Sequence, residues 1–355
     1  MVKLGSRPCN TIAPVATDGG ENRLSFEPLN FEIIRVVDSN GASLVETVIP
    51  LSLEEHVFSE YAQQLPQIQT LLAALSEAGQ KQLSFDNLSF LINALKPPKL
   101  DDENKPSDIR GRVRAFRDIV EWAVTFDLAS KEWPVDVLLL RDGLLRSKIF
   151  KLSVFPYLDR AFKGLYEASA RTGRKQTYLL GVAKTSAVLS KLGLSLLLED
   201  VFNKDYPCYA EVPKALEAKC YNFDKTWLET YVDREDKSDL RYQSFGNLYL
   251  AKLSPSRTAP VLPVDIPWWL PPDKRQSVLE YLAYDSRATF PHPGYPHSLQ
   301  RAHDFANMTG LEVTVLGDIM IDHLLHALPK RNVEKILRHV NLGKALLKGG
   351  IKRGD

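Results

Sequence analysis

The sequence has few of the features that mark secreted, zinc-binding or membrane proteins. Its three cysteines, Cys9, Cys208 and Cys220, are far apart and form no CxxC pair. Such usage fits a reducing cytoplasm and argues against a structural zinc site. The first ten residues lack an apolar signal core, and the most apolar later stretch, residues 192–198, is cut short by two acidic residues. We therefore expect neither export nor a membrane span.

Net charge is nearly absent as well. Lysine and arginine number 45 and aspartate and glutamate 44, which leaves a charge of +1. No global field attracts nucleic acid, so a nucleic-acid partner would have to meet a local basic patch. The 44% apolar and 25% charged residues are ordinary for a globular chain, and 355 residues can bury a large core. With no internal repeat evident, function has to be inferred from local motifs.

A short apolar run that stops at an aspartate is the first such motif. Residues 135–140 predict a strand covered on both faces, and Asp142-Gly143 ends it. Open α/β sheets bind ligands at the carboxyl ends of strands. Asp142, with Arg141 and Arg146 near it in sequence, therefore suggests a cation or phosphate site. The alternative is that Asp-Gly, a common turn dipeptide, does nothing more than turn the chain.

The same design occurs near the N-terminus. Residues 13–20 are a short apolar approach that ends in Asp18-Gly19-Gly20. Two β-rich runs, residues 30–37 and 42–50, then flank an Asn-Gly turn, which is a strong hairpin signal. We predict a three-stranded antiparallel meander whose first strand ends at Asp18.

Helical spacing of apolar residues dominates the next part of the chain. It predicts helices within residues 53–95, then a polar, proline-bearing loop at 96–106 and a long helix that runs to Leu128. Charged residues recur at helical spacing in the long helix, at Arg110, Arg114, Arg117 and Glu121. Either they form a solvated face of i,i+4 pairs, or they belong to a site.

After the strand over 135–140, the chain predicts a helix followed by a parallel strand, used twice, as in βαβ units. A helix over 157–172 leads to a buried strand over 177–182, and Lys184 follows between this strand and a helix over 187–194. Strand ends and helix N-termini both favour anions, so Lys184 is a candidate phosphate contact. Further strands are predicted over 248–253 and 261–266, and further helices from about residues 273 and 298.

This order of elements is that of an RNase H-like fold, in which acidic residues from strand ends and a helix gather divalent metal ions. At the level of motifs the chain resembles the NurA nuclease family. The motifs are TDGG at 17–20, Glu121 in the arginine-bearing helix, LLLRDGLLRS at 138–147, LLGVAKTS at 179–186 and GYPHSLQRAH at 294–303. Their order and separations match from about residue 14 to about residue 328.

The resemblance implies a DNA nuclease that depends on manganese, with magnesium as the alternative. It implies a homodimer that works with a hexameric HerA-type ATPase in DNA end processing, break repair or anti-phage defence, in the cytoplasm beside the nucleoid. The resemblance implies four metal ligands, Asp18, Glu121, Asp142 and His303. These four and Tyr295 are the implied catalytic residues. The expected phosphate or DNA contacts are Lys184, Arg146 and Arg114. Hard carboxylate oxygens with one imidazole suit these metals, and paired ions can activate water for attack on a phosphodiester.

Two positions depart from the family pattern. Gly20 stands where a small hydroxyl residue often follows Asp-Gly, and we expect this change to matter little. His297-Ser298 stands where the last motif commonly has another proline. Either His297 or His303 is therefore a candidate to approach the metal.

We expect a single α/β domain over residues 1–355, built on an RNase H-like mixed sheet with flanking helices. A helical elaboration covers 53–106, and a basic tail over 344–355 is a solvated end or, alternatively, a phosphate or partner contact. The elaboration, the N-terminal segment and Trp268-Trp269 are candidate contacts with a second copy or the ATPase. For the tryptophans, packing against the sheet is the alternative.

Two other functions compete with that of a nuclease. One is a catalytically silent adaptor or DNA-binding subunit of the same ATPase. The three carboxylates argue against it, because an adaptor has no need to bring together carboxylates that repel one another without metal. The other is a phosphatase, which would use similar carboxylates in a closed pocket and not in a DNA-wide channel. We expect the nuclease.

Overall fold

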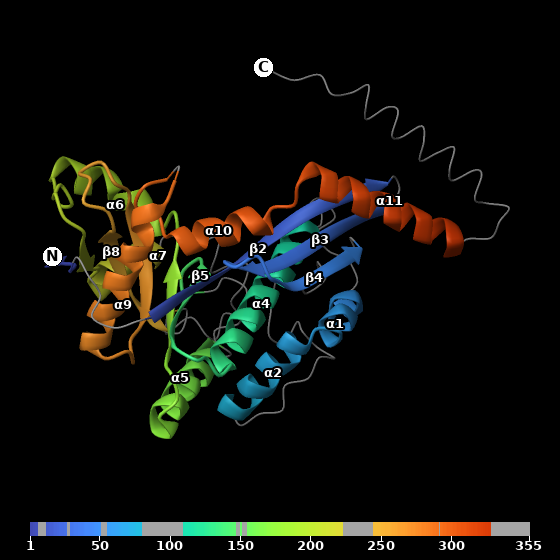
Figure 1. Cartoon of the computed structure of the whole chain (residues 1–355), viewed down its shortest axis with the longest axis horizontal. Helices are drawn as coiled ribbons and strands as arrows, with labels where there is room; N and C mark the ends of the chain where they lie inside the picture. Colours follow the sequence, from blue (N-terminus) through green and yellow to red (C-terminus); the bar gives the residue numbers. More distant parts are fainter. Residues whose placement is uncertain are drawn as a thin grey trace, which may run out of the picture.

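The architecture of the chain comes from a computed structural model that describes residues 1–5, 12–26, 29–50, 55–79, 109–146, 150, 155–222, 244–290 and 292–327. Within these residues nine strands form one mixed sheet, with helices on both faces (Figure 1). The predicted mixed α/β fold is confirmed. Residues 80–106 of the expected helical elaboration and the tail over 344–355 lie outside the described residues.

The sheet has the strand order β1-β7-β8-β9-β6-β5-β2-β3-β4. Its strands are β1 (Val2–Lys3), β2 (Ile12–Phe26), β3 (Leu29–Asp38), β4 (Ser43–Pro50), β5 (Asp136–Asp142), β6 (Thr177–Val182), β7 (Cys208–Glu211), β8 (Gly246–Lys252) and β9 (Val261–Pro267). Strands β2, β3 and β4 pair antiparallel as the predicted meander, and β5 and β6 run parallel to β2 on its other side. The part β4-β3-β2-β5-β6 therefore has the arrangement predicted for an RNase H-like sheet.

Strand β2 is longer than predicted. Its parallel pairing with β5 ends where Thr17 faces Arg141, but its antiparallel pairing with β3 continues to Phe26. The predicted strand end at Asp18 is therefore wrong, and Asp18 lies in mid-strand where β5 stops pairing with β2. The physical reason is that β3 supplies backbone hydrogen-bond partners along the whole strand, so the glycines after Asp18 do not interrupt it.

One face of the sheet is covered by four helices. They are α1 (Glu55–Gln63), α2 (Pro66–Gly79), α4 (Ile109–Ser130) and α5 (Phe155–Thr172). Their apolar sides form a core with Val15 of β2 and with Val137 and Leu139 of β5. Trp122 of α4 is fully buried in this core, against the aromatic rings of Phe150, Phe155, Phe162 and Phe245. The apolar face predicted for the long helix is confirmed.

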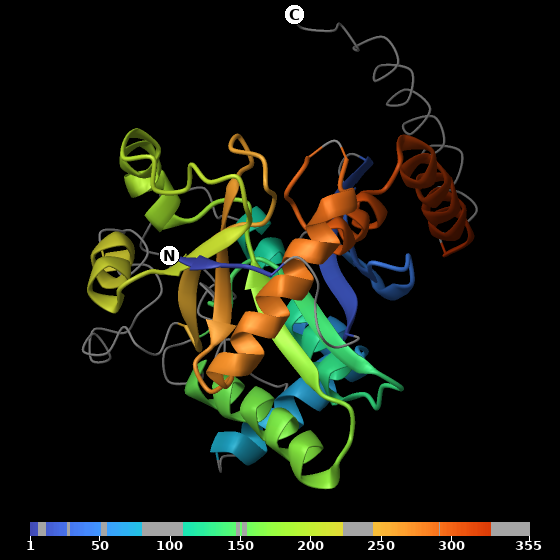
Figure 2. The same ribbon diagram turned by 60° about the vertical axis from the view of Figure 1, so that its left-hand side comes forward.

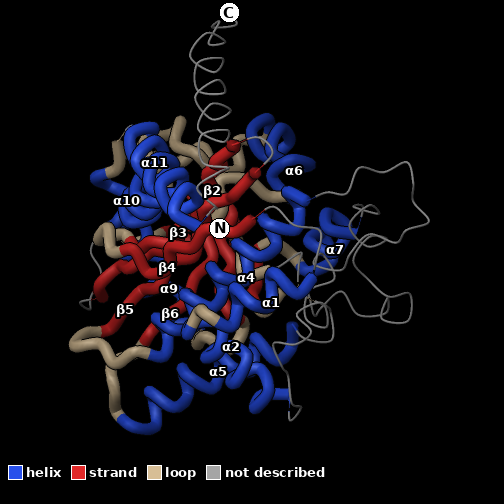
Figure 3. The backbone as a smooth tube through the Cα atoms, turned by 90° about the vertical axis from the view of Figure 1, so that its right-hand side faces the viewer, coloured by secondary structure: helices blue, strands red, loops and turns tan. Residues whose placement is uncertain are grey.

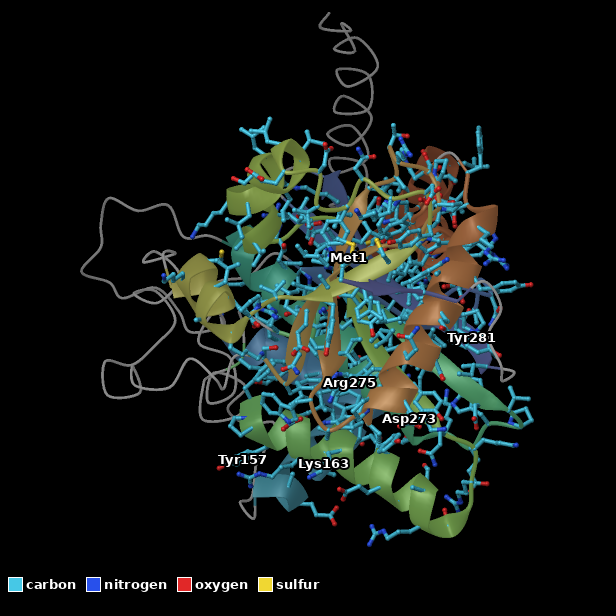
Figure 4. The ribbon with its side chains drawn as sticks, turned by 90° about the vertical axis from the view of Figure 1, so that its left-hand side faces the viewer. Met1, Tyr157, Lys163, Asp273, Arg275 and Tyr281 are labelled. Carbon is cyan, nitrogen blue, oxygen red and sulfur yellow. The ribbon has the colours of Figure 1, made fainter. Side chains whose placement is uncertain are left out.

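The opposite face carries α9 (Pro272–Asp285) and α10 (His297–Ala306). Figure 2 shows α9 in orange lying across the strands, and Figure 3 shows α10 on the other side of β2–β4 from α1, α2 and α4. Ala16 of β2 and Leu138 and Leu140 of β5 belong to the core on this face. Arg275 ties α9 to the sheet, because it donates to the Leu270 carbonyl at 2.8 Å and to the sheet's Tyr249 hydroxyl at 3.2 Å (Figure 4).

The other helical elements of the described residues are α6 (Ala187–Leu198), α7 (Lys214–Asn222), η5 (Ser286–Ala288) and α11 (Gly310–Ala327). Helix α6 begins as predicted, since the Ser186 hydroxyl accepts a hydrogen bond from the Leu189 amide. Helix α11 was not predicted, and an ion pair of 2.9 Å between Arg35 and Glu312 fastens its first turn to β3. In the part of the chain that the structure describes, no helix is long and apolar enough to cross a membrane.

The two adjacent tryptophans differ in their surroundings. Trp269 packs with its ring centre 5.1 Å from that of Tyr166, and its Nε1 donates to Asp159 Oδ1 at 3.0 Å. Trp268 is 40% exposed. Packing therefore accounts for Trp269, whereas Trp268 remains a candidate contact.

The Asp159 carboxylate gives a pH-dependent test of this packing. Burial raises its pKa to about 6, against the lowering effect of the hydrogen bond from Trp269. The folded state therefore holds this proton between about pH 4 and 6 when the unfolded state has lost it, so stability falls as pH rises through that range. Asp159→Asn keeps the acceptor oxygen and is expected to become more stable relative to wild type as pH rises from 4 to 7. Urea unfolding measures this difference, with Asp127→Asn as the control, and a constant difference would contradict the expectation.

Candidate metal centre

The alternation of side chains along β2 and β5 decides which residues can meet. Successive residues of a strand point to opposite faces of the sheet. Asp18 and Asp142 each come two positions after a residue that faces α9 and α10, namely Ala16 and Leu140, so they point to the same face. They lie one position beyond the last paired residues of β2 and β5, which are parallel neighbours. The two carboxylates therefore come together at one edge of the sheet.

Helix α10 adds the third group. His303 Nδ1 lies 2.8 Å from Asp18 Oδ2. One ligand atom from each of Asp18, Asp142 and His303 lies within 4.8 Å of the other two. Their side chains are 12%, 19% and 40% exposed, so the carboxylates are largely buried and the imidazole reaches solvent. Three of the four residues expected to bind metal are thus brought together, and of the two candidate histidines it is His303 that lies beside Asp18.

The cluster carries more negative than positive charge. Burial, together with the Asp18 charge, raises the pKa of Asp142 to about 6. Lys184 offsets this in part, because its Nζ lies 4.0 Å from Asp142 Oδ2, and it is 47% exposed. Crowded carboxylates of this kind gain from a hard divalent cation. Two carboxylates and one imidazole fit manganese or magnesium.

Tyr295 borders the cluster on the same face. Its side chain is buried, and its hydroxyl makes no hydrogen bond within the described residues. Burial raises the pKa of Tyr295, and the charges of Asp142 and Asp18 raise it further. The Lys184 ammonium lies 5.3 Å from the centre of the Tyr295 ring. The structure therefore places a protonated phenol and a cation beside the two carboxylates.

Glu121, the fourth expected ligand, lies on the α4 face of the sheet. Its Oε1 is 3.2 Å from Arg117 Nε, and its Oε2 is 3.3 Å from Arg141 Nη2. Burial raises the pKa of Glu121, and the Arg141 guanidinium opposes that shift. Glu121 does not belong to the group of ligand atoms around Asp18.

Two adjacent glycines let side chains and helices approach β2 from both faces. A Cβ atom on Gly19 would lie 2.3 Å from Glu121 Oε1, and one on Gly20 would lie 2.2 Å from the Ala306 carbonyl oxygen of α10. The expectation that Gly20 matters little is therefore wrong. The reason is that α10, which carries His303, packs directly on the Gly20 backbone.

The two arginines expected to contact DNA differ in how far they are exposed and in how strongly they are paired with acidic residues. Arg114 is exposed on α4, and its Nε lies 3.2 Å from Glu21 Oε1. Arg146 donates to the two carboxylate oxygens of buried Asp265 at 2.8 and 2.6 Å and lies 3.1 Å from Glu217. We therefore keep Arg114 as a candidate DNA contact and do not keep Arg146.

The sequence motifs did not identify the role of Arg141. It is 5% exposed and bonds to Glu121 and to Asp118, which was not singled out at all. A signal was present, because an arginine inside an otherwise apolar strand needs acidic partners when it is buried. What the sequence did not show was which acids these are.

The fold and the site define an α/β protein with a candidate carboxylate and imidazole metal centre where β2 and β5 stop pairing. A family model described as the NurA domain matches residues 14–308. The chain belongs to the NurA family.

Solved structures of NurA proteins are similar over nearly the whole chain. The crystal structure of the NurA nuclease from Sulfolobus solfataricus has 11% sequence identity and a TM-score of 0.43, over 92% of this chain and 90% of that chain. A second crystal structure of NurA has 14% identity and a TM-score of 0.38, over 95% and 92%. A crystal structure of NurA with manganese has 11% identity and a TM-score of 0.35, over 92% of each chain. No curated protein matches the chain.

Proposed function

We propose that this protein is a metal-dependent DNA nuclease that uses manganese or magnesium. The observation that carries the proposal is the meeting of Asp18, Asp142 and His303 ligand atoms within 4.8 Å. Membership of the NurA family supports it independently. Two close carboxylates would repel one another without a cation, so their approach is most simply explained by metal binding.

The described residues suit hydrolysis of a phosphodiester. A bound divalent ion supplies an activated water and stabilises the leaving oxygen. Asp18 and Asp142 would hold the ion from two neighbouring strands, and the hydrogen bond between Asp18 and His303 orients the imidazole. The half-exposed Lys184 would neutralise phosphate charge, and the Tyr295 hydroxyl, which has no hydrogen-bond partner among the described residues, is available to donate to an oxygen of the substrate.

We extend the proposal to the assembly. The protein would act as a homodimer with a hexameric HerA-type ATPase on DNA ends, in break repair or anti-phage defence, in the cytoplasm beside the nucleoid. We also propose that residues 1–355 form one nuclease domain. Family membership supports these extensions, and Arg114, exposed on α4, is our candidate for a DNA contact outside the metal centre.

The test is degradation of labelled linear single- and double-stranded DNA with manganese or magnesium, with and without the ATPase. Asp142→Asn is expected to reduce cleavage more than about 100-fold, because it removes one anionic ligand. Asp136→Asn is the matched control at the other end of β5, where Asp136 accepts a hydrogen bond from the Gln176 amide that an asparagine oxygen can also accept. Wild type that binds the ATPase but never cuts DNA would overturn the proposal in favour of an adaptor subunit.

A further inference from the structure

Arg141 connects the end of β5 to α4. Its Nη2 bonds to Asp118 and lies 3.3 Å from Glu121 Oε2, and its Nη1 donates to the Leu144 carbonyl at 3.3 Å. Its guanidinium carbon lies 4.5 Å from the centre of the Trp122 ring. Gly143 leaves room for this arrangement, because a Cβ there would lie 2.6 Å from Arg141 Nη1. The guanidinium is thus fixed by groups on three sides.

Glu121 has cationic partners without a metal. Arg141 and Arg117 contact its two oxygens at 3.3 and 3.2 Å. In the Asp18 cluster, by contrast, Lys184 Nζ lies 4.0 Å from Asp142 Oδ2, and the neighbour of Asp18 is the His303 imidazole. A further cation is therefore needed at Asp18 and Asp142, whereas two arginines already contact Glu121.

Glu121 is nevertheless close to the cluster. Its Oε1 lies against the Gly19 backbone, next in sequence to Asp18, where no side chain intervenes. The Asp18 charge is among those that act on the Glu121 carboxyl. A carboxylate this near to a bound cation would be attracted to it, and the two arginines oppose that movement.

We propose that Arg141 is a positioning residue that holds Glu121 on the α4 face of the sheet and competes with the metal ion for this carboxylate. The inference rests on the proposed metal centre. Its consequence is that the ion pair lowers the affinity of the centre for metal, so that weakening the pair strengthens metal binding.

The experiment measures Mn²⁺ binding by calorimetry, and thermal unfolding without metal, in the full-length protein. Arg141→Met is expected to lower the unfolding temperature without metal, because it leaves a buried carboxylate with one partner fewer. It is also expected to bind Mn²⁺ about tenfold more tightly, a coupling of ordinary size. The double variant Arg141→Met with Glu121→Gln is expected to show the affinity of Glu121→Gln alone.

Further variants separate this role from a general structural one. Arg117→Met removes the second partner of Glu121 from a partly exposed position and is expected to tighten Mn²⁺ binding by a smaller factor, which keeps the test open if Arg141→Met does not fold. Arg160→Met is the control, because Arg160 donates to the Ala78 carbonyl on α2 and makes no contact with Glu121.

Unchanged or weaker Mn²⁺ binding in the arginine variants that fold would overturn the inference, as would a gain that persists in the double variant. Absence of Mn²⁺ binding by wild type would instead overturn the metal centre itself. The two failures are therefore distinguishable.

Discussion

Asp18→Asn is expected to weaken Mn²⁺ binding more than about 100-fold, because Asp18 is the residue that joins the other two. It faces Asp142 across the strand pair and accepts the hydrogen bond that orients His303. The change removes one of two negative charges and leaves the imidazole without its acidic partner. Calorimetry with Mn²⁺ alone measures the affinity, and cleavage of linear DNA is expected to be lost in parallel.

The same substitution is expected to leave the metal-free protein at least as stable as wild type. Removing Asp18 relieves the repulsion that helps to raise the pKa of Asp142. A purely structural aspartate would behave in the opposite way, since its loss would lower the unfolding temperature. Asp322→Asn is the matched control, because Asp322 faces His326 at 3.6 Å in a second, exposed aspartate and histidine pair on α11. Retention of tight Mn²⁺ binding by Asp18→Asn would contradict the assignment.

Gly20→Ala is expected to cost about 1–3 kcal/mol of stability and to displace His303. The added Cβ would meet the Ala306 carbonyl oxygen of α10 at 2.2 Å, and backbone cannot move aside as a flexible side chain does. Helix α10 has to shift away from β2, which takes the imidazole away from Asp18. We expect a lower unfolding midpoint in urea together with weaker Mn²⁺ binding.

Two other glycines provide the comparison. Gly164→Ala on α5 meets no atom within 4 Å and is expected to be neutral or slightly stabilising. Gly19→Ala meets the Glu121 side chain, which is flexible, and is expected to perturb the α4 face without moving α10. If Gly20→Ala matched Gly164→Ala in both stability and metal binding, the packing of α10 on β2 would not be what holds His303 in place.

Much of the fold was predictable from short stretches of sequence. The bounds of β6 agree with the prediction, because a buried apolar run over 177–182 has Lys175-Gln176 directly before it and Lys184 shortly after it. The Asn-Gly hairpin between β3 and β4 was predictable for the same local reason, since Gly41 has the positive φ of +85° that the turn requires. The end of β2 was not, because the pairing that extends it comes from β3 and not from its own residues.

The candidate site was predictable in its residue types and less so in its arrangement. Asp142 was identified because it follows a buried strand, which is a local property. Glu121 was identified as a ligand, but its carboxylate pairs with Arg117 and Arg141. Arg146 was expected to meet phosphate, but it pairs with Asp265, which is 119 residues away in the chain.

The sequence by itself determined most of the strands and helices, though not α11 or the end of β2, and it determined the alternation that turns Asp18 and Asp142 to one face, and the family. Only the tertiary structure decided which charged groups meet: α10 brings His303 to Asp18 across 285 residues of sequence, while Arg117 of α4 and Arg141 of β5 pair with Glu121. The physical reason is one of range. Secondary structure depends on neighbours within a few residues, whereas ion pairs and metal ligands depend on distances of a few ångströms between residues that only packing brings together.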